Sequence, residues 1–370
     1  MILPTPEADC KSGPARLAAA RAEFDAQVSY LNTATLGLPP RRSWLALQAA
    51  LTDWRAGTAD PVAYDAPLAA ARSSYAQLVG VHPSAVAVGS QVSVFAGLIA
   101  ACLPDGGEVL TAAGDFTSIL FPFYAQVGRG VTVREVPLER LADEVSPQTN
   151  LVSVSAVQSA DGRVADLDAL QAACAASETR VLLDTTQAVG WLPVDASRFA
   201  YTVCGGYKWL LSPRGTAYFT VRPELLDDLI PHTAGWYAGD DPWSSIYGAP
   251  LRLAGDARRF DVSPAWHAWV GAGPAVTLLA DLGTDALHGH ALGLANRFRA
   301  GVGLEPGDSA IVSLAVDDGA ADAMRNARIM ASVRARRLRL SFHVSTSEQD
   351  VDRATEVLRR HVLHSDGALH

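Results

Sequence analysis

Short apolar runs alternate with longer helical patterns through most of the chain. Runs at residues 131–136, 151–154 and 180–184 each have the length of a buried strand. Strands that alternate with helices predict a doubly wound α/β sheet, because each helix carries the chain back for the next parallel strand. We expect one large domain of this kind over residues 29–265, preceded by an N-terminal arm and helix over residues 1–28.

The last third of the chain has a different pattern. A long helical pattern begins at Trp266, and strands are predicted at residues 310–315 and 338–344. A final helix is predicted from about residue 347 to residue 361. This order predicts a small C-terminal α+β domain over residues 266–370.

Composition narrows the class of protein. Of the 370 residues, 49% are hydrophobic and 19% are charged, so the chain can bury a substantial core. A net charge of -9 offers no basic surface for nucleic acid, and the longest apolar stretch, residues 94–103, is too short to cross a membrane. Four cysteines without even spacing, and an N-terminus without a basic-apolar leader, favour a cytoplasmic protein.

Two pairs of histidines have short spacings, His288 with His290 and His361 with His364. Neither pair has a cysteine or a carboxylate cluster beside it, and a bound metal needs such additional ligands. We therefore expect no metal site.

Lys208 is the first candidate for chemistry. It follows a predicted strand at residues 199–204 and a pair of glycines, and a second strand is predicted at residues 216–221. A lysine that is partly removed from water loses proton affinity, becomes a nucleophile near neutral pH and can hold a carbonyl cofactor as a Schiff base. The alternative is a lysine that extends from a loop into solvent. The only other lysine, Lys11, lies in the predicted arm, so Lys208 is the one interior candidate.

Asp184 ends the predicted strand at residues 180–184 and stands 24 residues before Lys208. A carboxylate at the carboxyl end of a parallel strand points into the crevice where open α/β sheets bind ligands. If the ligand is pyridoxal 5'-phosphate (PLP), the carboxylate keeps the ring nitrogen protonated, and Gln187 can donate to the phenolic oxygen. The alternative for Asp184 is a helix N-cap.

Eight short segments occur in the order expected of one enzyme family. They are residues 30–37, 89–93, 114–118 and 155–162, Asp184 with Gln187, Tyr207 with Lys208, and residues 259–264 and 339–343. Together they resemble the class V aminotransferases, fold-type I PLP enzymes that include cysteine desulfurases, carbon-sulfur lyases, kynureninases and epimerases. The resemblance covers nearly the whole chain. It implies a mostly parallel seven-stranded sheet in the large domain, PLP as cofactor, and a homodimer with active sites at the interface.

The resemblance implies a role for each matched residue around the cofactor. Lys208 would form the Schiff base, Asp184 would bind the ring nitrogen, and Phe116 would stack on the ring, with a core residue as the alternative for Phe116. Backbone N–H groups of Gln91 and Val92 would bind the phosphate at the N-terminus of a helix. The other matched cofactor residues are Ser90, Gln158, Ser159, Gln187, Tyr207 and Ser263, the last on a loop that members lend across a dimer interface.

Several positions depart from the family pattern. Tyr207 replaces a common histidine, although its hydroxyl could also reach the phosphate. Gly205 replaces a phosphate-binding serine, and Gln158 with Ser159 stand where asparagine is common.

Arg339 matches the arginine that binds the α-carboxylate of the amino-acid substrate as a bidentate fork. It lies in a basic run at residues 334–339, and the alternation over residues 338–343 predicts a half-exposed strand, so the alternative is a solvated strand residue. The remaining substrate candidates are Asn32 and Thr33 in the first segment, and Trp236 and Tyr237 in an aromatic, glycine-rich loop near the expected substrate entrance. The alternative for that loop is a packed surface segment.

The cysteines bear on the type of reaction. Cysteine desulfurases accept sulfur on a cysteine shortly before the position of Arg339, whereas no cysteine of this chain falls between residues 205 and 370. The segments at residues 235–243 and 258–264 resemble those of actinobacterial carbon-sulfur lyases such as the hercynylcysteine sulfoxide lyases. We therefore expect β-elimination on an S-conjugated cysteine or its sulfoxide. The alternatives are an aminotransferase or epimerase, and a non-catalytic PLP-binding partner protein.

Overall fold

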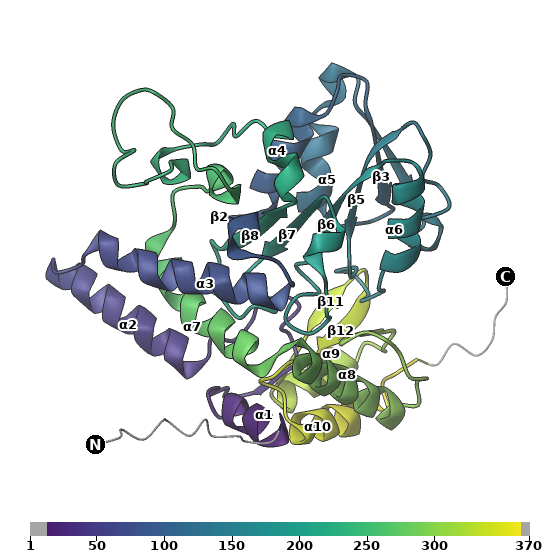
Figure 1. The fold of residues 1–370 in the computed structure, drawn as a ribbon. Coiled ribbons are helices and arrows are strands. Elements are labelled where there is room, and N and C mark those ends of the chain that lie inside the picture. The colour runs from purple at the N-terminus through teal and green to yellow at the C-terminus, as the bar shows by residue number, and fades with distance from the viewer. Residues whose placement is uncertain (1–12, 364–370) are drawn as a thin grey trace, which may run out of the picture.

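The computed structural model describes residues 13–363, and Figure 1 shows a large sheet with its helices next to a smaller unit that contains the last helices and strands. Helix α1, Gly13–Arg21, forms the helix expected within the N-terminal arm. Residues 1–12 of that arm, with Lys11, lie outside the described residues.

The large sheet has seven strands in the order β2-β8-β7-β6-β5-β3-β4. Strand β8 is antiparallel to both of its neighbours, β2 and β7, and the other neighbouring pairs are parallel. This confirms the predicted α/β sheet. The strands are β2 Val86–Gly89, β3 Glu108–Ala112, β4 Thr132–Val136, β5 Thr149–Ser155, β6 Arg180–Asp184, β7 Tyr201–Gly205 and β8 Ala217–Val221.

Helices cover both faces of this sheet, because alternate residues of a strand point to opposite sides. Val86 and Val88 of β2 belong to one hydrophobic core, and Ala87 between them belongs to the other. The first core is completed by α3 Asp65–Leu78, α6 Leu167–Ala176 and α7 Trp266–Leu282, and the second by α4 Val92–Cys102 and α5 Thr117–Tyr124. Helix α2, Arg41–Ala56, packs on α7 and extends away from the sheet (Figure 1).

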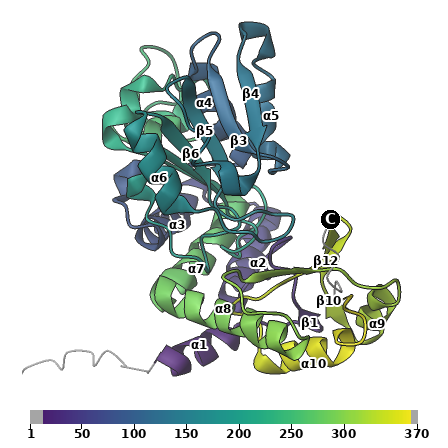
Figure 2. The same cartoon turned by 90° about the vertical axis from the view of Figure 1, so that its right-hand side faces the viewer.

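The smaller unit contains a three-stranded antiparallel sheet in the order β11-β12-β9. A separate hydrophobic core lies between this sheet and its helices. Figure 2 shows the unit below the large sheet, with α7 and α8 at the junction. Its elements are α8 Thr284–Gly301, β9 Ile311–Leu314, α9 Ala320–Asn326, β10 Ile329–Met330, β11 Ser332–Arg334, β12 Arg337–Ser341 and α10 Glu348–Leu358.

Two features cross the expected domain boundaries. Strand β1, Ser29–Tyr30, pairs in parallel with β10, and Leu31 lies in the core of the smaller unit. Helix α7, which the sequence assigns to the C-terminal domain, shares its core with the large sheet. The division into residues 29–265 and 266–370 remains a prediction.

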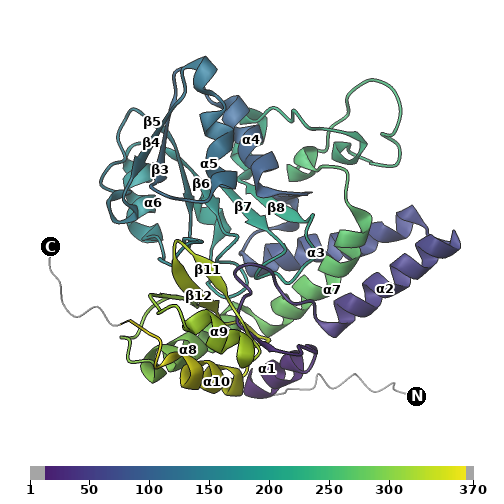
Figure 3. The same cartoon turned by 180° about the vertical axis from the view of Figure 1, so that it is seen from behind.

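Two structural features determine where a ligand can bind. Strands β5, β6 and β7 end at the same edge of the sheet, and Lys208 stands in the turn after β7, behind Gly206 and Tyr207. The turn requires glycine at Gly206, because a Cβ atom there would lie 2.4 Å from Thr216 Oγ1. Seen from behind, the wide green loop before α7 extends beside α4 (Figure 3). Within residues 13–363 no helix has the length and apolarity needed to span a membrane.

Candidate active site

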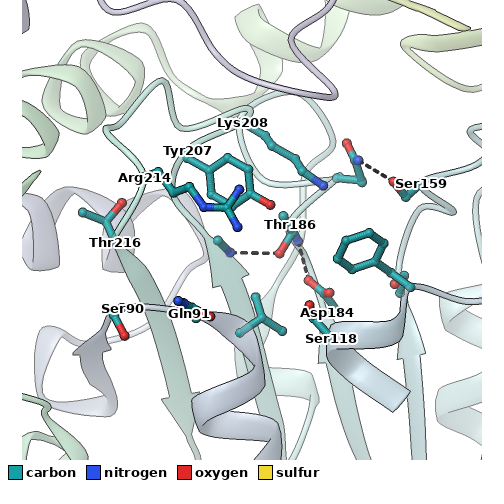
Figure 4. Close-up of a pocket in the computed structure, with 15 residues that line it drawn as sticks. Ser90, Gln91, Ser118, Ser159, Asp184, Thr186, Tyr207, Lys208, Arg214 and Thr216 are labelled. Atoms are coloured by element: carbon teal, nitrogen blue, oxygen red, sulfur yellow. Dashed lines mark hydrogen bonds between the residues drawn. The ribbon is translucent and has the colours of Figure 1, made fainter. Parts of the chain in front are cut away.

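A pocket lies at the edge where β5, β6 and β7 end and where α4 begins (Figure 4). It brings together nine of the residues that the sequence assigned to the site, and adds six others. The predicted ones are Ser90, Gln91, Val92, Phe116, Ser159, Asp184, Gln187, Tyr207 and Lys208; the additional ones are Ser118, Ser155, Thr186, Gly205, Arg214 and Thr216.

Lys208 is 5% exposed, so the alternative of a solvent-directed lysine is wrong. Its Nζ makes no hydrogen bond or ion pair with any described residue, and it lies 5.1 Å from the centroid of the Phe116 ring. Burial lowers the pKa of Lys208 to about 8; the charge of Asp184 opposes this shift, and the charge of Arg339 adds to it. The unprotonated fraction of the amine near neutral pH is therefore much larger than that of an ordinary lysine, as a nucleophile requires.

Asp184 lies at the carboxyl end of β6 and is 4% exposed. Its Oδ1 accepts a hydrogen bond from the backbone N–H of Thr186 at 2.8 Å, and no helix begins there, so the N-cap alternative is wrong. Burial raises the pKa of Asp184 to about 6, while bonds from Thr186 and the charge of Lys208 oppose the shift. No described residue donates to Oδ2. A cationic N–H donor from a ligand would satisfy this oxygen and stabilise the charged form.

Both polar atoms of the Gln187 side chain are hydrogen-bonded within the protein. Its Nε2 donates to Ala34 O at 3.0 Å and to Ser159 Oγ at 3.0 Å, and its Oε1 accepts from Trp209 Nε1 at 2.8 Å. Both amide protons are therefore used, and the predicted donation from Gln187 to a phenolic oxygen would require one of these bonds to break. Ser159 Oγ accepts from Gln187, so its own hydrogen is available to a ligand instead.

Arg339 is 1% exposed on β12, so the alternative of a solvated strand residue is wrong. Its Nη1 donates to the carbonyl and hydroxyl oxygens of Ser159, and its Nη2 donates to Thr35 Oγ1 at 2.8 Å. Its Nε is buried without a hydrogen-bond partner, and no carboxylate of residues 13–363 pairs with it. Burial lowers the pKa of Arg339 to about 10, and the charge of Arg334 adds to the shift. A substrate carboxylate would relieve both deficits.

One end of the pocket is suited to an anion. Helix α4 begins at Val92, and its N-cap residue, Gln91, makes no side-chain cap to the first N–H groups. Unsatisfied N–H groups at a helix N-terminus attract phosphate. Arg214 adds a positive charge here, with its guanidinium carbon 5.0 Å from the centroid of the Tyr207 ring.

Phe116 lines the pocket and is 42% exposed, so the alternative of a core residue is wrong. Gln158 does not line the pocket; its Nε2 donates to Asp115 Oδ2 at 3.2 Å. Asp115 also accepts from the backbone N–H of Ser155 at 2.7 Å and from its hydroxyl at 2.5 Å. Gln158 is therefore a support for the end of β5 and not a lining residue in this structure.

The remaining predicted residues, like Arg339, lie outside the pocket lining. Thr33 is fully buried, and the Oδ1 atom of Asn32 is buried without a partner. Ser263 is exposed, and whether it acts across a dimer interface remains a prediction.

The aromatic loop is held by Asp65, at the start of α3. Tyr237 Oη donates to Asp65 Oδ1 at 2.7 Å, and Trp243 Nε1 donates to Asp65 Oδ2 at 2.7 Å. The rings of Trp236 and Trp243 pack with centroids 5.1 Å apart. Within the chain this loop is packed, as the alternative expected. A role for Trp236 and Tyr237 in substrate specificity remains a prediction.

The missed residues had weak signals in the sequence. Arg214 and Thr216 stand in the turn that follows Lys208, whereas Ser118 and Ser155 lie in segments matched to the family without a role of their own. Among the described residues, no group of three or more His, Cys, Asp or Glu side chains is placed to hold a metal ion.

The residues present fit PLP. The pocket supplies an unpartnered buried amine, a buried carboxylate with one oxygen free, and the open N-terminus of a helix, which match the aldehyde, the ring nitrogen and the phosphate. Fold and site together therefore define a fold-type I PLP-dependent enzyme. The chain belongs to the family described as Aminotransferase class-V, whose sequence profile matches residues 68–313. Its cofactor is PLP, and it acts on an amino acid.

Known relatives and solved structures match most of the chain. An uncharacterized aminotransferase of Bacillus subtilis is 25% identical over 80% of this chain and 84% of its own length. Isopenicillin N epimerase of Streptomyces clavuligerus is 25% identical over 90% of this chain and 95% of its own length. The structure of the cystine C-S lyase C-DES is 23% identical with a TM-score of 0.80, over 91% of this chain and 98% of that one.

Proposed function

We propose that this enzyme catalyses β-elimination on an S-conjugated cysteine or its sulfoxide. The observation that carries the proposal is the placement of Lys208 beside Phe116, whose ring centroid lies 5.1 Å from Nζ. The amine has a pKa lowered to about 8, and the ring carries no titratable proton. This arrangement supplies one base for the α-proton.

PLP, when bound, withdraws electrons from the substrate Cα and so permits loss of its proton and of a group on Cβ. Asp184 holds the positive charge of the ring nitrogen, and Arg339 binds the α-carboxylate and so fixes the orientation of the substrate. Lys208 Nζ then takes the proton from Cα. The Cβ–S bond breaks, sulfur leaves with the electron pair and a proton, and water releases the remaining skeleton as pyruvate and ammonia.

Two features favour elimination over the other reactions of the family. A two-base epimerase needs a second proton carrier opposite Lys208, and Phe116 cannot act as one. A desulfurase needs a thiol to accept sulfur, and no cysteine follows Cys204 in the sequence. Resemblance to the actinobacterial carbon-sulfur lyases remains a prediction, as does a cytoplasmic location.

We also propose that the enzyme works as a homodimer. Helix α2 exposes Trp44, Leu45 and Trp54, which is more apolar surface than a monomeric helix usually presents to water. A second copy that covers α2 would bury these side chains. Light scattering with size-exclusion chromatography should give twice the chain mass, and Trp54→Glu should shift it toward the monomer; a fully active wild-type monomer would refute this assignment.

The reaction is tested with S-substituted cysteines and their sulfoxides in the absence of any keto acid. Pyruvate is followed with lactate dehydrogenase, and Lys208→Ala is the control. Pyruvate formation that requires wild-type enzyme and no keto acid supports the lyase. Product that appears only after addition of a keto acid would identify an aminotransferase, and failure to turn over any amino acid would favour a non-catalytic PLP-binding protein.

A further inference from the structure

Two arginines of the small sheet share one hydrogen-bond acceptor beside the active site. Thr35 Oγ1 accepts from Arg339 Nη2 at 2.8 Å and from Arg334 Nη2 at 3.4 Å. Arg334 lies on β11 opposite Arg337 of β12, and Arg339 lies two residues further along β12. Residues opposite one another, and residues two apart on a strand, lie on the same face of a sheet. The guanidiniums of Arg334 and Arg339 are therefore on one side of the hairpin, together with that of Arg337, which donates to Ser313.

Among residues 13–363 this pair of positive charges has no negative partner. No carboxylate between residues 13 and 363 forms an ion pair with Arg334 or with Arg339. The two charges repel: the charge of Arg334 helps to lower the pKa of Arg339, after burial, and also contributes to the lowered pKa of Lys208. Water screens part of the charge of Arg334, which is exposed, but Arg339 is buried and its Nε lacks any partner.

The two arginines differ in what they can reach. Arg339 contacts Ser159, which lines the pocket, so it is placed for the α-carboxylate that every amino acid carries. Arg334 lies nearer the turn of the hairpin, at Ala335 and Arg336; it is exposed, and its Nη1 donates to Val333 O at 2.8 Å. A group bound by Arg334 is therefore more distant from Lys208 and belongs to the substrate side chain.

Resting on the proposed function, we propose that the preferred substrate is an amino acid whose side chain carries a second anionic group, a carboxylate or a sulfonate. Arg339 binds the α-carboxylate, and Arg334 binds the second anion. A guanidinium is well suited to this task, because its planar N–H fork matches the geometry of both anions. Arg334 is thus a specificity residue and takes no part in proton transfer.

The test compares ligands of equal shape that differ only in charge. Glutamate and glutamine are titrated against the PLP-loaded enzyme, and binding is measured from the change in cofactor absorbance and by calorimetry. Wild-type enzyme should bind glutamate on the order of tenfold more tightly than glutamine. Arg334→Gln should abolish this preference, and Arg334→Lys, which keeps the charge without the fork, should retain part of it.

Arg336→Gln is the matched control, because it removes the same charge from the same hairpin, where Arg336 is exposed and makes no hydrogen bond to a described residue. It should leave the preference unchanged. Equal loss in both variants would show a general charge effect. An equal loss of affinity for glutamate and glutamine in Arg334→Gln would assign Arg334 to the α-carboxylate. Either result, or a wild-type enzyme without preference, overturns the inference.

Catalysis is tested with a pair of substrates that differ in the same way as glutamate and glutamine. They are S-carboxymethylcysteine, which is an acid, and its carbamoylmethyl analogue, which is the neutral amide. The specificity constant for the acid should exceed that for the amide in the wild type, and the two should converge in Arg334→Gln. If neither compound yields pyruvate while the binding preference persists, the proposed elimination is wrong and the assignment of Arg334 stands.

Discussion

The indole Nε1 of Trp209 donates a hydrogen bond to Gln187 Oε1 at 2.8 Å. This bond joins the residue after Lys208 to the segment after Asp184, so it links the nucleophile to the carboxylate through the buried core. His343 binds the backbone of Trp209, since its Nε2 donates a hydrogen bond to the carbonyl oxygen of Trp209 at 3.0 Å. Burial lowers the pKa of His343 to about 3, and the ring therefore stays neutral.

Trp209→Phe tests the value of this link. The substitution keeps an aromatic ring but leaves a buried amide oxygen without a donor, which should cost about 1–3 kcal/mol in the free energy of unfolding. Urea denaturation of the apoenzyme measures this directly. An unchanged midpoint would mean that Gln187 finds another donor at no cost.

Lys208→Ala should remove the covalent link to the cofactor. Borohydride treatment of the PLP-loaded wild type should fix the cofactor to the peptide that contains Lys208, and the variant should show no such product. Its thermal unfolding as apoenzyme should be close to that of the wild type, because the buried amine makes no bond that stabilises the fold. A wild-type peptide map with unmodified Lys208 would contradict the proposed role.

The lowered pKa of Lys208 predicts a pH dependence for cofactor capture. Only the neutral amine attacks the aldehyde, and its fraction increases as the pH rises through about 8. The rate at which apoenzyme binds PLP should therefore increase between about pH 7 and 9 and then level off, whereas an ordinary lysine would give a rate that still increases toward pH 10. Stopped-flow absorbance distinguishes the two profiles.

The sequence predicted the sheet well because strand periodicity is a local property. The expected strand at residues 180–184 matches β6, and the expected helix start at Trp266 matches α7. The pairing of β1 with β10 could not be predicted, because it joins residues about 300 positions apart through backbone bonds that leave no pattern in side chains. Expectation of a half-exposed strand around Arg339 was wrong for the same reason, since contacts from distant segments bury both of its faces.

Residues of the site were predictable where the chemistry demands one residue type. A Schiff base needs lysine, and Lys208 is the one lysine among the described residues. Gln187 shows the limit: its residue type was informative, but its amide protons are already used by Ala34 and Ser159. Arg214 was missed because a cation in a loop has many possible roles, and its position over Tyr207 depends on the path of the turn.

Asp184→Asn should separate cofactor binding from catalysis. Asparagine keeps the shape of the side chain but cannot balance a protonated ring nitrogen, so electron withdrawal weakens. We expect turnover to fall by orders of magnitude while the protein still retains PLP, as measured by absorbance after gel filtration. A near-wild-type rate would show that another group protonates the ring.

Arg339→Ala tests the assignment of the substrate carboxylate. Loss of a bidentate charge-assisted contact should raise KM about tenfold or more for every amino-acid substrate, because all of them share the α-carboxylate. Arg337→Ala is the matched control: it lies on the same strand, is exposed, and donates only to Ser313, at 3.3 Å and 3.2 Å. Its kinetics should be unchanged.

Because Arg339 is buried, circular dichroism and PLP content must first show that the Arg339→Ala variant is folded. Arg339→Lys then provides a smaller perturbation that keeps the charge. A folded Arg339→Ala protein with wild-type KM values would place the carboxylate site elsewhere and would remove one of the two anion contacts on which the preference for acidic substrates rests.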